Sequence, residues 1–227
     1  MPPNLDQASA GAKMNFDRRW PARIAEVLLV LMVGFGAWIW QSVTISYRMW
    51  VLGQPLPQAW LTNAALLRLG GFELIAVAVI SVIACARGWS FKAFGWCISW
   101  RLTGVALALF ACGVLVYFFL PLGLHFRGRV SLWALVPTMA VNAFYEESLE
   151  VGYVFRVFGR FGVWPAVLAS ALLRGGIHLY AGLPAVLAIF AAGVLAGLIY
   201  WRTKSLWPLF LAHLLDDLLV LIPLVKM

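Results

Sequence analysis

Ionisable residues concentrate in three apolar segments of the carboxyl-terminal half of the chain. They are Glu146, Glu147 and Glu150 in the first segment, Arg174 and His178 in the second, and His213, Asp216 and Asp217 in the third. Each segment holds two of them four positions apart, which places the pair on one face of an α-helix. Charges in hydrocarbon are costly unless they are paired or hydrated, so function is to be sought on these three faces.

These residue types are suited to peptide-bond hydrolysis. A carboxylate and an imidazole that face one another can hold and deprotonate a water molecule, and a second imidazole beside an aspartate can bind the developing oxyanion. Two histidines and one glutamate could also bind zinc, but the chain lacks an HExxH motif, so a site without metal or cofactor is favoured. The alternative is a structural polar cluster that holds three helices together.

The composition excludes a water-soluble globular protein. Of the 227 residues, 63% are hydrophobic and 11% are charged, whereas soluble domains have about 25% charged residues. The sequence predicts an all-α, polytopic transmembrane helix bundle of about seven spans, since each span needs about 20 apolar residues. The predicted spans are residues 23–46, 60–86, 98–121, 130–158, 163–181, 184–201 and 206–225.

The fourth predicted span is overlong and carries three carboxylates, so we expect it to tilt and to break or emerge near Gly152. The depth of the polar residues follows from a rise of 1.5 Å per residue. Counted from the helix ends near residues 158, 164 and 206, Glu146, His178, His213 and Asp217 lie at about 18, 21, 10 and 16 Å. They are therefore expected in one layer of the membrane.

Three regions and one orientation are predicted along the chain. Residues 1–19 are polar and are expected to form a disordered cytoplasmic tail, 20–94 the amino-terminal spans with an interfacial segment at 88–97, and 95–227 the helical core. Eleven Lys and Arg residues fall on the amino-terminal side, against four on the other side. Because basic residues are retained in the cytoplasm, this predicts a protein of the bacterial inner membrane with a cytoplasmic amino terminus. Arg68 and Arg174 fall within spans and need a structural reason.

Three motifs then carry a resemblance to a known family. They are EESLEVGYVF from Glu146, RGGIH ending at His178, and HLLDD from His213. Their order and rough spacing resemble the motifs EExxxR, FxxxH and HxxxN/D of the CAAX protease and bacteriocin-processing family, the membrane family of type II CAAX prenyl endopeptidases. The resemblance covers about residues 95–222 and implies a helical membrane protease.

The resemblance also implies roles for five residues. Glu146 matches the catalytic base of the family, and Glu147 matches the second glutamate of the motif. His178 matches the partner that helps to hold the water, and His213 with Asp217 matches the pair that stabilises the oxyanion.

Two positions depart from the family pattern. Val151 stands where the motif has arginine, and Arg174 stands where it has phenylalanine. Because a guanidinium at this depth must find a carboxylate or water, we expect Arg174 to reach the neighbouring glutamates, Glu150 included, and to replace the missing arginine. Val151→Arg would then partly rescue the loss of Arg174. The alternative is that Arg174 pairs with Glu73 or extends towards water.

The favoured function is an intramembrane glutamic-type endopeptidase without metal, acting on a peptide or membrane-protein segment in the cytoplasmic half of the bilayer. The first alternative is a catalytically degenerate relative that serves as a scaffold or partner subunit of another membrane protein. A proton-relaying transporter is a weaker alternative, because no inverted repeat is detectable. The lipid bilayer is a partner in every case, and the basic excess reflects topology, so no nucleic-acid partner is expected.

Overall fold

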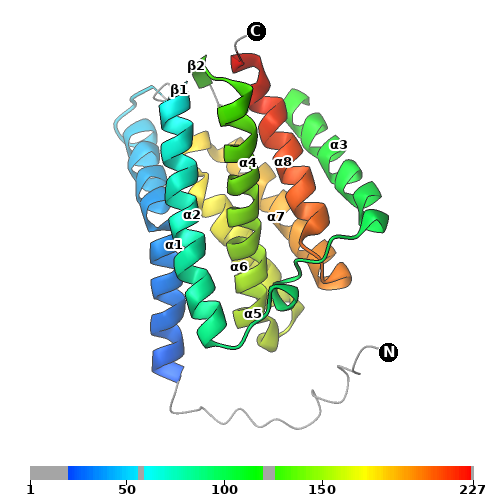
Figure 1. The fold of residues 1–227 in the computed structure, drawn as a ribbon. Coiled ribbons are helices and arrows are strands. Elements are labelled where there is room, and N and C mark those ends of the chain that lie inside the picture. The colour runs from blue at the N-terminus through cyan, green and yellow to red at the C-terminus, as the bar shows by residue number, and fades with distance from the viewer. Residues whose placement is uncertain (1–19, 56–58, 120–125, 226–227) are drawn as a thin grey trace.

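A computed structural model describes residues 20–55, 59–119 and 126–225 of the chain. These residues form an all-α bundle of apolar helices, as the sequence predicts (Figure 1). The helices are α1 (Trp20–Trp50), α2 (Asn63–Ala86), α3 (Thr103–Phe119), α4 (Leu132–Glu146), α5 (Val154–Phe158), α6 (Val163–Ile177), α7 (Leu183–Thr203) and α8 (Trp207–Leu221). The tail predicted at residues 1–19 lies outside the described residues.

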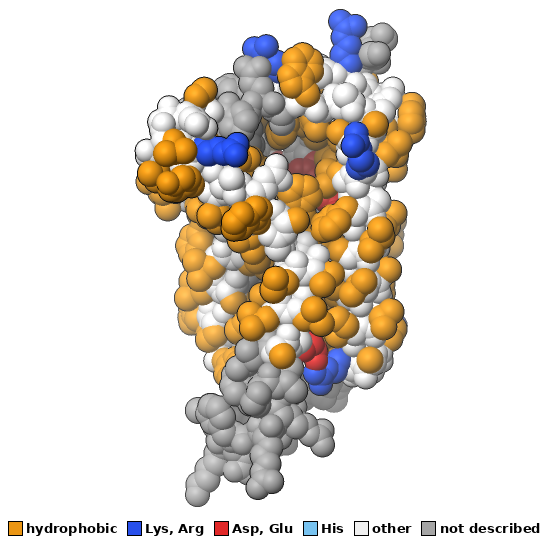
Figure 2. Space-filling view, turned by 90° about the vertical axis from the view of Figure 1, so that its left-hand side faces the viewer, with side chains coloured by type: hydrophobic (Ala, Val, Ile, Leu, Met, Phe, Trp, Pro, Cys, Tyr) orange, Lys and Arg blue, Asp and Glu red, His pale blue; other side chains and the backbone are white. Residues whose placement is uncertain are grey.

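The outer surface of the bundle is suited to a lipid environment. Hydrophobic side chains cover much of its length, with basic side chains towards the two ends (Figure 2). Within the described part of the chain, five helices are long and apolar enough to cross a membrane: Ala25–Trp50, Asn63–Ala86, Trp100–Phe119, Leu183–Thr203 and Trp207–Leu224. The protein is thus an integral membrane helix bundle, and the predicted number of about seven spans stays a prediction.

The fourth predicted span does not break at Gly152. A π-helical segment, Glu147–Tyr153, joins α4 to α5, so the backbone stays helical through this region. A π-helix closes its hydrogen bonds over five residues instead of four, which rotates the following side chains relative to an α-helix. Gly152 is needed there for packing, because a Cβ atom would lie 3.0 Å from the Phe94 ring and 3.2 Å from Leu206.

The two ends of the bundle differ in structure. At one end, which we call the β end, strands β1 (Ala59–Thr62) and β2 (Phe126–Arg129) pair in parallel next to the last turn of the chain, Ile222–Leu224 (Figure 1). At the opposite end, which we call the base end, α1 begins, α2 ends and α8 begins. Gly128 in β2 has φ +127°, and any side chain there would collide with the Leu61 backbone.

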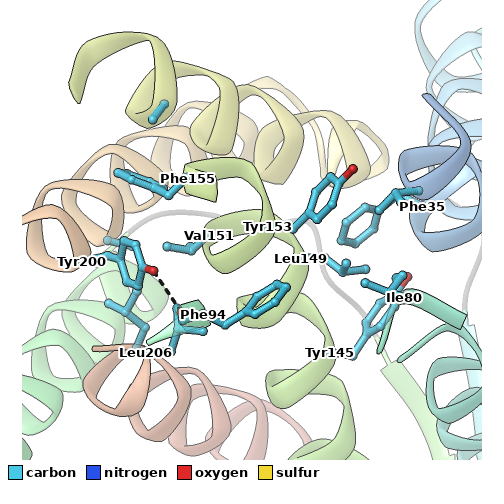
Figure 3. Packing of buried hydrophobic residues seen from close by; sticks show 14 of the residues in the cluster. Phe35, Ile80, Phe94, Tyr145, Leu149, Val151, Tyr153, Phe155, Tyr200 and Leu206 are labelled. Carbon is cyan, nitrogen blue, oxygen red and sulfur yellow. Dashed lines mark hydrogen bonds between the residues drawn. The ribbon is translucent and has the colours of Figure 1, made fainter. Parts of the chain in front are cut away.

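A buried apolar cluster surrounds the π-helical segment (Figure 3). Val151 packs there with Phe94, Phe155, Tyr200 and Leu206, and the Tyr200 hydroxyl donates a hydrogen bond to the Phe94 carbonyl over 2.9 Å. The segment expected to be interfacial, residues 88–97, therefore contributes to the core as well. Its Phe94 is buried and its Trp89 packs against the cluster, although Phe91 and Lys92 are exposed.

Candidate active site

Three parts of the bundle bring the predicted polar residues together in one cavity. The cavity has a volume of about 610 Å³ and lies between α4 with its π-helical extension, α6 and α8, with further walls from α3 and α7. The acidic, basic and histidine side chains that line it are Glu146, Glu147, Arg174, His178, His213, Asp216 and Asp217. The polar faces of the three segments therefore meet, while the catalytic roles of these residues stay a prediction. Glu150 is fully buried behind the cavity wall.

Arg174 contacts two of the glutamates from the neighbouring helix. Its Nη2 lies 2.5 Å from Oε1 of Glu147, and its Nε lies 2.7 Å from Oε2 of Glu150. The side chains are 13%, 2% and 0% exposed, respectively, so both ion pairs are shielded from solvent. The expectation that Arg174 reaches the acidic cluster is confirmed for Glu147 and Glu150. The alternative pairing with Glu73 is wrong, because Glu73 is bound elsewhere.

His213 is oriented by Glu147. Its Nδ1 lies 2.9 Å from Oε1 of Glu147, the same oxygen that accepts from Arg174. A carboxylate oxygen held by a guanidinium is an acceptor, so Nδ1 carries a proton. Nε2 of His213 lies 3.7 Å from both Glu146 and Asp217, which is beyond a hydrogen bond. The expected pairing of His213 with Asp217 is thus only a loose approach, and Glu147 fixes the ring.

His178 presents one ring nitrogen without a backbone contact. It caps the carboxyl end of α6, and its Nδ1 lies 2.9 Å from the backbone carbonyl of Arg174. A carbonyl only accepts, so Nδ1 is the donor and carries the proton in the neutral ring. The lone pair is then on Nε2, which can accept a hydrogen bond from a water molecule or a substrate group.

Asn142 links the site to the amino-terminal helices. Its side-chain amide donates to Oε1 of Glu73 on α2 over 2.7 Å and to Oε1 of Glu146 over 3.2 Å. Glu73 is fully buried. The sequence interpretation noticed Glu73 only as a rival partner for Arg174 and did not consider Asn142. The available signal was the four-residue spacing from Asn142 to Glu146, which places both on one helix face.

The two departures from the motif pattern have different surroundings. Arg174 lies in the polar network, whereas Val151 is fully buried in the apolar cluster with Phe94 and Phe155. Figure 3 shows Val151 among these apolar side chains. An arginine at position 151 would therefore enter an apolar environment.

The donor set does not form a recognisable metal centre. Within residues 20–55, 59–119 and 126–225, no group of three or more His, Cys, Asp or Glu side chains has the arrangement needed to hold a metal ion. His178 and His213 each have one ring nitrogen close to an oxygen acceptor of the protein.

The fold and the cavity define a helical membrane protein with glutamate, histidine and aspartate side chains around one internal space. A family model described as "Type II CAAX prenyl endopeptidase Rce1-like" matches residues 128–219, which is less than half of the chain. This match confirms the resemblance to the CAAX protease family, and it indicates a membrane protease with a peptide or protein substrate. The search of curated proteins and the search of solved structures each found no match.

The matched segment includes the acidic residues, the arginine and the histidines that line the cavity. It leaves out α1, α2 and α3, and with them Glu73. The contact between Glu73 and Asn142 thus joins a helix outside the matched segment to one inside it.

Proposed function

We propose that the protein is a glutamic-type intramembrane endopeptidase, in which Glu146 and His178 activate a water molecule that attacks a peptide bond. The observation that carries the proposal is the arrival of Glu146, His178 and His213 at one cavity from three separate helices. A structural polar cluster needs no cavity of this size. A hydrolase needs one, because its substrate must reach the water.

Two acceptors can align the attacking water. Oε1 of Glu146 is held by Asn142, so its Oε2 is free to take one water proton. Nε2 of His178 can accept the other water hydrogen, because Nδ1 is the donor to Arg174. The water oxygen then adds to the substrate carbonyl carbon. Glu146 holds the transferred proton and returns it to the leaving amine when the carbon–nitrogen bond breaks.

His213 is placed to stabilise the oxyanion formed in this step. Its Nδ1–H donates to Glu147, which fixes the plane of the ring. When Nε2 also carries a proton, it can donate a hydrogen bond to the negatively charged oxygen. Arg174 holds Glu147 in turn, so the guanidinium acts on His213 through the carboxylate.

We also propose that residues 95–227 form the functional core and that residues 20–94 support it. Glu73 on α2 orients Asn142, which orients Glu146. The protein is placed in a bacterial inner membrane with its amino terminus in the cytoplasm, as the distribution of basic residues favours.

The test uses the full-length protein in vesicles. The peptide substrate ends in a cysteine, two aliphatic residues and one further residue, and it is supplied with and without a prenyl group on the cysteine. Mass spectrometry measures cleavage. Glu146→Gln and His178→Ala are expected to lower turnover by at least about 10²-fold, the usual contribution of a general base. Glu26→Gln is the matched control, because Glu26 pairs with Arg87 at the base end, away from the cavity.

Chelators are expected to leave turnover unchanged. Inhibition by a chelator that added zinc reverses would assign the site to the metalloproteases instead. If Glu146→Gln cleaves as well as the wild type, the glutamic mechanism is wrong.

A further inference from the structure

The cavity lining follows α8 from Leu209 to Leu221 and extends as far as the β end of the bundle. Towards the β end its wall includes Val116 and Tyr117 near the end of α3, Phe126 in β2 and Leu221 at the end of α8. Among the described residues, no lining residue comes from residues 86–102, 156–165 or 200–207, the stretches that form the base end. The described lining of the polar site therefore reaches the β end but not the stretches that form the base end.

Basic residues concentrate at the opposite end. In the described part of the chain the base end has Arg87, Lys92, Arg101, Arg156, Arg160, Arg202 and Lys204, and the β end has Arg48, Arg68, Arg127 and Arg129. Arg68 is assigned to the β end because it lies in the second turn of α2, where its Nε donates to the carbonyl of Ala64. The basic residues preceding α1, Lys13, Arg18 and Arg19, also precede the base end. Short loops rich in Lys and Arg stay in the cytoplasm.

The wall of the cavity is suited to an apolar segment. α7 contributes small side chains, including Ala188, Ala191 and Ala192, together with the larger apolar side chains Ile189 and Leu195. Arg127 and Arg129 are exposed on either side of Gly128, next to Phe126, which lines the cavity. Two cations beside this end favour a substrate with an acidic group or a free carboxylate following its apolar part.

We infer that the substrate enters from the non-cytoplasmic end of the bundle, as an apolar peptide segment of an exported or membrane protein. That the segment entering the cavity is a substrate rests on the proposed function. Entry from the non-cytoplasmic end replaces the expectation of access from the cytoplasmic half of the bilayer, because the lining reaches the β end, which is opposite the end rich in basic residues. A cytoplasmic prenylated chain end would have to approach from the end that contributes nothing to the cavity.

The native cysteines provide the test. Cys112 lines the cavity, and Cys97 is exposed at the base end. Three variants each keep one cysteine. The first keeps Cys112 and carries Cys85→Ser and Cys97→Ser, and the second keeps Cys97 and carries Cys85→Ser and Cys112→Ser. The third lacks all native cysteines and carries Gln54→Cys. Gln54 is exposed near the β end, and it is preferred to Gly128, which has no room for a side chain.

A small, charged, membrane-impermeant methanethiosulfonate is added to intact bacterial cells that produce each full-length variant. Cys112 and Gln54→Cys are expected to be labelled from outside, and Cys97 only after permeabilisation. Labelling of Cys112 only after permeabilisation, or under neither condition, overturns the inference. Labelling of Cys97 but not of Gln54→Cys in intact cells reverses the orientation and overturns it as well.

The labelling pattern does not depend on hydrolysis. If the wild-type protein fails to cleave peptides while Cys112 is labelled from outside, the proposed function fails and the accessible cavity stands. If Glu146→Gln abolishes cleavage while Cys112 is reached only from the cytoplasm, the protease stands and the inference of non-cytoplasmic access fails.

Discussion

The two sides of the π-helical segment Glu147–Tyr153 are equally buried but are stabilised differently. On one side, the buried acids Glu147 and Glu150 both contact the same cation, Arg174. On the other side, Leu149 and Val151 bury apolar surface in the cluster of Figure 3. Burial stabilises an apolar side chain directly, whereas it stabilises a charge only when a partner compensates the lost solvation. Removing a charge from the first side and adding a charge to the second should therefore both destabilise the protein.

The largest change in stability is expected on the charged side. Arg174→Ala removes the cation that contacts both buried acids, Glu147 and Glu150, and breaking a buried ion pair costs about 3 to 5 kcal/mol. Thermal unfolding in detergent measures the loss. Arg68→Ala is the control, because Arg68 is exposed and bonds only to a backbone carbonyl of its own helix. A loss below about 1 kcal/mol for Arg174→Ala would show that the ion pairs do not stabilise the fold.

A charge on the apolar side should also destabilise. Val151→Arg places a guanidinium among Phe94, Phe155 and Tyr200, at a cost of about 3 kcal/mol, because an unpaired buried ion is penalised by several kcal/mol. Because Val151 has apolar surroundings, we no longer expect Val151→Arg to rescue the loss of Arg174. Thermal unfolding of the double variant Arg174→Ala and Val151→Arg decides the matter. A double variant more stable than Arg174→Ala alone would show that the two arginine positions are interchangeable.

A smaller effect is expected for the link between the amino-terminal helices and the site. Asn142→Ala removes the donor that holds Glu146 and should lower kcat about tenfold, or about 1.4 kcal/mol, with little change in KM. Asn63→Ala is the control. Asn63 bonds Ser131 through both its amide nitrogen and its oxygen, and neither residue lines the cavity. A rise in KM with unchanged kcat would place Asn142 in substrate binding instead.

The smallest effect is expected at Asp217. Its carboxylate lies 3.7 Å from His213 and does not orient the ring, which Glu147 already holds. Asp217→Asn keeps the size of the side chain and should change kcat/KM by less than about threefold, or about 0.7 kcal/mol. Peptide cleavage measures it, with Glu147→Gln as the contrasting variant. A loss for Asp217→Asn as large as that for Glu147→Gln would show that the site needs a negative charge at position 217.

The sequence determined the elements and their polar faces. A membrane requires apolar runs of about 20 residues, and such runs are visible locally, so the predicted span 184–201 falls within α7, Leu183–Thr203. Spacing also fixes which residues share a helix face, as for Arg174 and His178. The order of the three motifs was sufficient to identify the family resemblance that the match over residues 128–219 confirms.

Only the tertiary structure decided which partners these faces meet. Spacing within one helix says nothing of that helix's rotation and depth relative to its neighbours, because both depend on packing between segments distant in sequence. Packing therefore selected Glu147 and Glu150 over Glu73 for Arg174, and Glu147 over Asp217 for His213. It also placed Val151 in the apolar cluster and extended the cavity lining to Phe126 in β2.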